Sequence, residues 1–154
     1  MAELTLREEI LDEPGGQAMI AGFEADIAAR YPGWNPGSGP GLTPADVLPP
    51  DGRLVVAYLG SDPAGCGAFK RLDERHVEVK RVFVAPKARG RGVARAIVGR
   101  LEELARDAGY AVVRLDVGDN QPEAFALYQS LGYTEIPDYN NNPWASYWFE
   151  KPLA

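Results

Sequence analysis

A glycine-rich turn is the part of the sequence best suited to bind an anion. It reads Lys87-Ala88-Arg89-Gly90-Arg91-Gly92 and stands between the apolar run Val82-Phe83-Val84 and a helical pattern near Val93. Free backbone N–H groups at a helix N-terminus attract phosphate, and glycines let a phosphate approach the backbone closely. Arg89 and Arg91 add positive charge. The same glycines would also serve a tight helix entry without any ligand.

Two common nucleotide-binding motifs do not fit this turn. A P-loop requires Gly-Lys followed by Ser or Thr, a triplet that the sequence lacks. The dinucleotide fingerprint requires a third glycine where Arg95 stands. The turn therefore indicates a phosphate-bearing ligand that is bound in another way.

The turn resembles the acetyl-CoA motif of the Gcn5-related N-acetyltransferase (GNAT) family, which is Gln/Arg-x-x-Gly-x-Gly/Ala after a strand. Lys87 replaces the first residue of that motif, so the charge is kept but a forked hydrogen-bond pair is lost. The stretch Ala124 to Tyr133 resembles the family's second signature, Ala-x-x-Leu-Tyr-x-x-x-Gly-Phe/Tyr, at the matching distance. The resemblance covers the chain from Leu54 to Lys151.

The resemblance implies that acetyl-CoA is the cosubstrate, and we expect no metal. In the family, the strand before the turn carries a bulge and splays from its neighbour, so that its backbone pairs with pantetheine. The pyrophosphate would lie on the turn. Gln121 occupies the position where the family commonly has a pantetheine-binding Asn, and Asn120 stands one residue too early. The residues expected to bind the cofactor are Val82, Phe83, Val84, Lys87, Arg89, Gly90, Arg91, Gly92, Val93, Ala94, Gln121 and Tyr128.

Acetyl transfer to an amine requires a nitrogen lone pair, a polarised thioester carbonyl and a proton for the thiolate. The resemblance implies Tyr128 as the acid, although its ring also fits the apolar face of a helix. Glu78 occupies the place of the catalytic glutamate in histone-acetylating members, so we expect it to be the general base. Lys80 and Arg81 offer the alternative that Glu78 is an ion-pair partner. His76 also titrates near neutral pH, but the start of a strand favours an exposed edge.

Aromatic and amide side chains outside these motifs are expected to form the acceptor site. They lie in the Pro- and Gly-rich loop after residue 30 and in the turn-rich stretch near the C-terminus. Such walls suit an amine-bearing small molecule or peptide, although strand packing or a dimer surface would use the same side chains. The residues are Tyr31, Trp34, Tyr139, Asn140, Asn141, Asn142, Trp144 and Tyr147.

Residue patterns predict the elements that position these groups. They indicate strands at 4–8, 53–59, 65–72, 76–84, 111–117, 133–136 and 146–150, and helices at 14–30, 90–109 and 121–131. An unbroken strand over 76–84 would place Glu78 and Val82 on one face. The order predicts an α+β fold, an α/β/α sandwich with a mixed sheet, and the resemblance adds six to seven mainly antiparallel strands with a splayed pair.

Composition limits the classes of function. The 154 residues suit one domain, so we treat 1–154 as a single acetyltransferase domain. A net charge of −6, from 16 basic and 22 acidic residues, argues against nucleic acid. One Cys and one His exclude a disulfide framework and a Cys/His zinc site. With no long apolar stretch and no signal-like first ten residues, we expect a cytoplasmic protein without a membrane span.

We therefore expect an acetyl-CoA-dependent N-acetyltransferase that transfers the acetyl group directly to a primary amine. The alternative is a non-catalytic CoA-binding sensor or module of the same fold, and the departures at Lys87 and Gln121 favour it. The resemblance also makes a homodimer a possible assembly.

Overall fold

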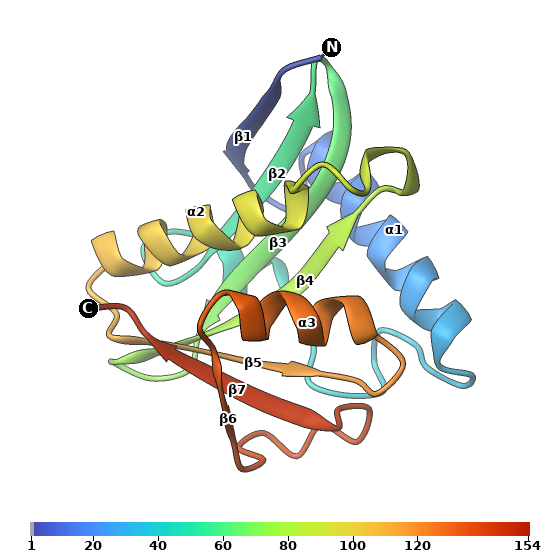
Figure 1. The fold of residues 1–154 in the computed structure, drawn as a ribbon. Coiled ribbons are helices and arrows are strands. Elements are labelled where there is room, and N and C mark those ends of the chain that lie inside the picture. Colours follow the sequence, from blue (N-terminus) through green and yellow to red (C-terminus); the bar gives the residue numbers. More distant parts are fainter. Residues whose placement is uncertain (1) are drawn as a thin grey trace.

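A mixed β-sheet forms the middle of the molecule. The computed structural model describes residues 2–154, and its seven strands follow the order β1-β2-β3-β4-β5-β7-β6 (Figure 1). Strands β4 and β5 run parallel, and the other neighbouring strands are antiparallel. The strands are β1 (Leu4–Glu9), β2 (Arg53–Leu59), β3 (Asp62–Arg71), β4 (His76–Val84), β5 (Val112–Val117), β6 (Thr134–Ile136) and β7 (Tyr147–Pro152).

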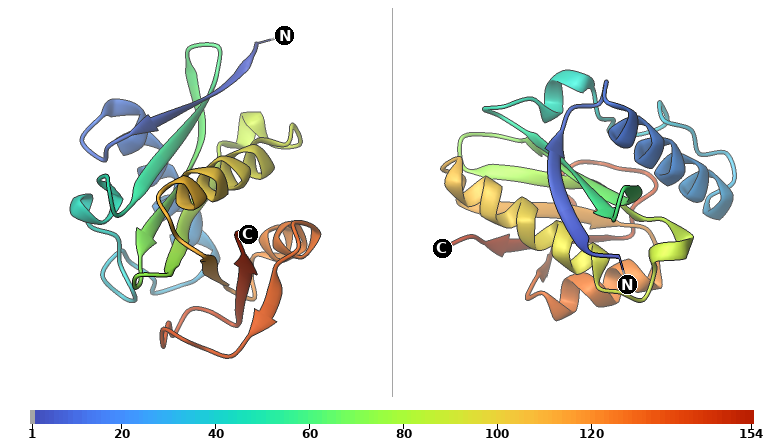
Figure 2. Two further views of the ribbon diagram at one scale, coloured as in Figure 1. Left: turned by 90° about the vertical axis from the view of Figure 1, so that its left-hand side faces the viewer. Right: turned by 90° about the horizontal axis from the view of Figure 1, so that it is seen from above.

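Helices cover both faces of the sheet, which confirms the predicted α/β/α sandwich (Figures 1 and 2). Helix α1 (Pro14–Arg30) packs on one face, and α2 (Val93–Asp107) and α3 (Pro122–Ser130) pack on the other. Apolar residues one helical turn apart build these contacts, as the buried side chains of Ile97 and Leu101 in α2 show. Within residues 2–154, none of the helices combines the length and apolar character that a bilayer span needs.

Strands β4 and β5 separate partway along their length, which confirms the predicted splayed pair. Their pairing covers only His76–Glu78 against Val112–Arg114, although both strands continue beyond it. On its other side, β4 has a bulge at Arg81, whose φ of 62° lies in the left-handed region. The thiol of Cys66 donates a hydrogen bond to the Arg81 carbonyl at 3.2 Å. The sheet is therefore open between β4 and β5.

The bulge changes which side chains of β4 share a face. Val79 packs in the core beneath α2, and Val82 packs against the same core, whereas Phe83 packs against α1. Because the extra residue shifts the alternation by one position, Glu78 and Val82 do not share a face as they would in an unbroken strand. Glu78 instead faces the connection between β6 and β7.

Candidate active site

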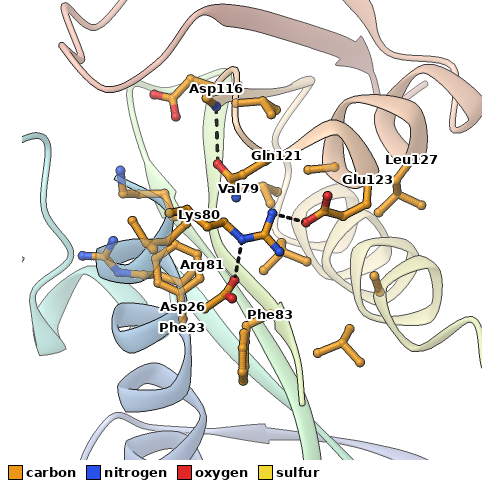
Figure 3. Close-up of a pocket in the computed structure, with 18 of the residues that line it drawn as sticks. Phe23, Asp26, Val79, Lys80, Arg81, Phe83, Asp116, Gln121, Glu123 and Leu127 are labelled. Carbon is orange, nitrogen blue, oxygen red and sulfur yellow. Dashed lines mark hydrogen bonds and ion pairs between the residues drawn. The ribbon is translucent and has the colours of Figure 1, made fainter. Parts of the chain in front are cut away.

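A cavity of about 670 Å³ lies where β4 and β5 separate, a volume typical of small-molecule sites (Figure 3). Its wall contains β4 from Val79 to Val84, the turn before α2, the end of β5 and one side of α3. The loop after α1 and the connection between β6 and β7 close the opposite side. The two sequence motifs therefore meet at one cavity.

The turn before α2 keeps backbone donors free for an anion. Gly90 and Gly92 have φ values of 80° and 75°, and Gly92 is the N-cap of α2. A Cβ atom added at either glycine would meet nothing within 4 Å, so open space adjoins the backbone. Within the described part of the chain, the backbone N–H groups of residues 90–95 donate no hydrogen bond to any protein acceptor. A pyrophosphate is the kind of ligand that such a turn holds.

Most of the residues expected to bind the cofactor lie in the cavity wall. Lys87 and Arg91 are exceptions, because both side chains are exposed outside it. The side-chain amide of Asn120 donates to the Arg30 carbonyl at 2.8 Å, whereas Gln121 lines the cavity. Those in the wall are Val82, Phe83, Val84, Arg89, Gly90, Gly92, Val93, Ala94, Gln121 and Tyr128.

Tyr128 extends from α3 into the wall and is only 5% exposed. Its ring stands edge-on to Tyr133, with 5.4 Å between the ring centres. Burial raises the pKa of Tyr128, and the charges of Asp116 and Glu102 raise it further. The phenol therefore stays protonated through the neutral pH range.

Glu78, the predicted general base, lies behind the cavity wall rather than in it. It is 2% exposed and accepts hydrogen bonds from the Tyr139 hydroxyl at 2.6 Å and the Asn140 amide at 3.0 Å. Lys80 pairs with the second carboxylate oxygen at 3.3 Å, as the ion-pair alternative expects. His76, the other titratable candidate, pairs with Asp73 at 2.8 Å at the hairpin before β4.

Asp116 is a carboxylate in the cavity wall that the sequence analysis missed. It lies near the end of β5 and accepts hydrogen bonds from the side-chain amides of Asn140 at 2.6 Å and Asn142 at 3.2 Å. Burial raises the pKa of Asp116, and the bond from Asn140 and the charge of Lys80 oppose that rise. The sequence offered one signal for Asp116, which is a carboxylate near the end of a predicted strand. The parallel pairing of β4 with β5, which brings that strand end to the glycine turn, was not readable from the sequence.

The Asn140 amide connects the two carboxylates. Its oxygen accepts from the Trp148 indole at 2.9 Å and from the Asn142 backbone N–H at 3.1 Å. These two bonds direct the NH₂ group toward Glu78 and Asp116. Glu78 therefore helps to fix the group that holds Asp116.

The residues predicted to form the site of the acceptor amine fall into two groups, those that line the cavity and those outside its wall. Tyr31, Trp34, Asn142 and Trp144 line the cavity, and the Trp144 indole donates to the Ser38 carbonyl at 3.0 Å. The others lie outside the wall: Tyr139 and Asn140 contact Glu78, Asn141 is exposed, and Tyr147 packs against Phe125 with 4.7 Å between ring centres.

Arg30, in the cavity wall, connects α1 and α3. Its guanidinium pairs with Glu123 of α3 and with Asp26 of α1, the latter at 3.3 Å (Figure 3). It also donates to the Asn120 carbonyl at 3.1 Å. This cation is thus fully engaged by the protein itself.

The chain is similar in sequence and in structure to known acetyltransferases. Residues 20–133 match the sequence profile of the Acetyltransferase (GNAT) family. The IAA acetyltransferase of Azospirillum brasilense is 38% identical over 108 residues, which cover 68% of this chain and 70% of that protein. A Klebsiella pneumoniae protein assigned to the acyl-CoA N-acyltransferases has a TM-score of 0.81 at 25% identity, over 100% of both chains. A GNAT family acetyltransferase from Elizabethkingia anophelis, solved with acetyl-CoA bound, has a TM-score of 0.68 at 14% identity over 97% of each chain.

The profile spans both sequence motifs, and the structure brings those motifs to one cavity. The likeness of fold extends over the full length of the chain. From sequence, fold and cavity together, the chain belongs to the GNAT family and is an acetyl-CoA-dependent acetyltransferase.

Proposed function

We propose that the protein transfers the acetyl group of acetyl-CoA directly to the primary amine of a small molecule or peptide. The continuous cavity is the observation that carries this proposal. Its wall includes the anion-binding turn, Tyr128 and Asp116, together with the aromatic side chains of Trp34 and Trp144. One space therefore accommodates both the thioester and the amine.

In the proposed reaction, the amine nitrogen attacks the thioester carbonyl carbon and forms the C–N bond. The C–S bond breaks, and the departing sulfur takes a proton from the Tyr128 hydroxyl. Asp116 accepts the proton that the amine loses. The backbone N–H of Val82, next to the bulge, polarises the carbonyl oxygen.

We assign the general base to Asp116 because its carboxylate adjoins the cavity. The role predicted for Glu78 differs in this proposal, since three donors of the protein surround that carboxylate. Glu78 acts here as a positioning residue that holds Asn140 and Lys80. The two assignments predict different pH profiles.

The substitution Asp116→Asn is expected to lower kcat/KM by about tenfold or more and to remove the acidic limb of its pH profile. Burial raises the pKa of Asp116 above its ordinary value of 3.8, so wild-type activity falls as the pH drops through that raised pKa. Glu78→Gln, the matched variant, should keep the limb. If the acidic limb of the pH profile were lost in Glu78→Gln and kept in Asp116→Asn, Glu78 and not Asp116 would be the general base.

Thermal unfolding separates this effect from a loss of folding. Because the pKa of Asp116 is raised in the folded state, its ionisation opposes folding at any pH above that pKa. Asp116→Asn should therefore unfold at a temperature no lower than the wild type at neutral pH. The difference should vanish below the unfolded pKa, where both side chains are neutral.

Acetyl transfer to a panel of primary amines tests the function as a whole. Release of the CoA thiol would be measured together with the mass of the acetylated amine, and acetyl-CoA binding by calorimetry. Thiol release that depends on an amine supports the proposal. Binding without transfer to any amine would indicate the non-catalytic module, and absence of binding would contradict both functions.

A further inference from the structure

Arg81 places an unpaired cation in the cavity wall. It extends from the bulge of β4 toward α1, and its guanidinium carbon lies 5.2 Å from the ring centre of Phe23 and 5.9 Å from that of Trp34 (Figure 3). Among residues 2–154, no carboxylate forms an ion pair with this guanidinium, and no oxygen accepts a hydrogen bond from it. Its five N–H donors are therefore available to a ligand.

The neighbouring cations of the wall differ from Arg81. Lys80 is neutralised by Glu78 at 3.3 Å, and Arg30 is neutralised by Glu123 and Asp26. Burial lowers the pKa of Arg81, against the more distant charges of Glu24 and Asp116, but a guanidinium remains protonated at neutral pH. A partly buried charge without a partner is costly to the fold, so it calls for a counter-ion.

The surroundings of Arg81 define the kind of counter-ion. Phe23 and Trp34 lie near the guanidinium as cation–π partners, and neither side chain carries an oxygen that could accept its N–H groups. The N–H groups lie on its edges, where they match the two oxygens of a carboxylate in a forked pair. The site therefore suits a planar carboxylate.

The carboxylate that would pair with Arg81 is expected to be part of the acceptor rather than of acetyl-CoA. The phosphates of the cofactor are expected at the turn before α2, which covers one face of the sheet. Arg81 contacts Phe23 of α1, which packs on the other face, and Trp34 of the loop that follows α1. Arg81 is thus on the side where the proposed amine enters.

We propose that the acceptor carries a carboxylate that pairs with Arg81, so that its substrates are amino acids or closely related amines. This inference rests on the proposed function, because it assigns the acceptor of the same reaction. Asp116 provides the complementary half of the recognition, since its carboxylate receives the amine. The cavity wall thus offers opposite charges to the two ends of an amino acid.

The wild-type protein provides the first test. Acetyl transfer would be measured with free amino acids, their carboxamides and amines without a carboxylate, for example L-phenylalanine, L-phenylalaninamide and 2-phenylethylamine. We expect kcat/KM for the best amino acid to exceed that for its carboxamide by about 100-fold. The carboxamide has the less basic amine, which is less protonated at neutral pH, so intrinsic reactivity opposes the expected order.

The substitution Arg81→Gln tests the assigned residue. The ratio of kcat/KM between the amino acid and its carboxamide should fall to near one, mainly through a higher KM for the amino acid, and Arg81→Lys should restore only part of it. Arg7→Gln is the matched control, because Arg7 makes a similar contact with the Tyr58 ring at 4.7 Å outside the cavity wall. The control should keep the full ratio.

The outcomes separate the two proposals. Equal or better transfer to carboxamides or simple amines by the wild type would overturn the carboxylate inference and leave the proposed function standing. Transfer to no amine at all would overturn the proposed function and the inference with it. A ratio that is unchanged in folded Arg81→Gln would contradict the role of Arg81.

Discussion

Replacing Gly90 with glutamate is expected to weaken acetyl-CoA binding by at least about 100-fold, because the new carboxylate would lie where the backbone N–H groups await a pyrophosphate. The open space beside Gly90 is the approach path of the ligand, and the substitution fills it with a negative charge. Calorimetric titration of acetyl-CoA into the variant and the wild type measures the effect. Undiminished binding by Gly90→Glu would mean that these glycines serve only the helix entry.

Gly109→Glu is a matched control for this experiment. Gly109 follows the other end of α2, has a φ of 93° and, like Gly90, has open space where a Cβ atom would stand. Each substitution adds one negative charge and forces a left-handed conformation at a cost of about 1–2 kcal/mol. Both variants should therefore lose thermal stability, Gly109→Glu somewhat more because its carboxylate lies at the negative end of the helix dipole, and only Gly90→Glu should lose acetyl-CoA.

The sequence was sufficient to predict the helices and strands, because the decisive signals for them were local. The apolar spacing in α2 and the glycine that follows it set the end of that helix, and Pro14 and Pro122 mark the starts of α1 and α3. The cofactor side of the cavity was predictable for the same reason. One continuous segment, from β4 through the glycine turn, supplies most of that side.

The acceptor side was harder to predict because distant segments build it. The bulge at Arg81 places a residue other than glycine at a φ of 62°, which no local pattern announces. That single bulge separates Glu78 from Val82 and directs Arg81 toward α1. Asp116 reaches the cavity only because β5 pairs briefly with β4 and then diverges. The family resemblance implied a bulge and a splayed pair, but the spacing of side chains does not show which residues these features bring to the cavity.

Tyr128→Phe is expected to lower kcat by about 100-fold while acetyl-CoA still binds, because a positioned acid commonly contributes ~10²–10⁴-fold to the rate. The substitution removes only the hydroxyl and keeps the buried ring that packs against Tyr133. The raised pKa keeps this hydroxyl protonated, so the alkaline side of the wild-type profile should show no loss of activity from Tyr128 at moderately basic pH. Single-turnover measurement of thiol release reports the chemical step directly.

Tyr133→Phe distinguishes catalysis from packing. Tyr133 is also buried, at 6% exposure, but its hydroxyl donates to Glu102 at 2.8 Å, away from the cavity wall. Glu102 would keep its bond from Lys151 at 2.9 Å, so this variant should lose stability rather than activity. Tyr128→Phe should show the opposite pattern, since its hydroxyl adjoins the cavity and has no partner among the described residues. An unchanged rate of thiol release in Tyr128→Phe would remove Tyr128 from the reaction and leave its ring as a packing group.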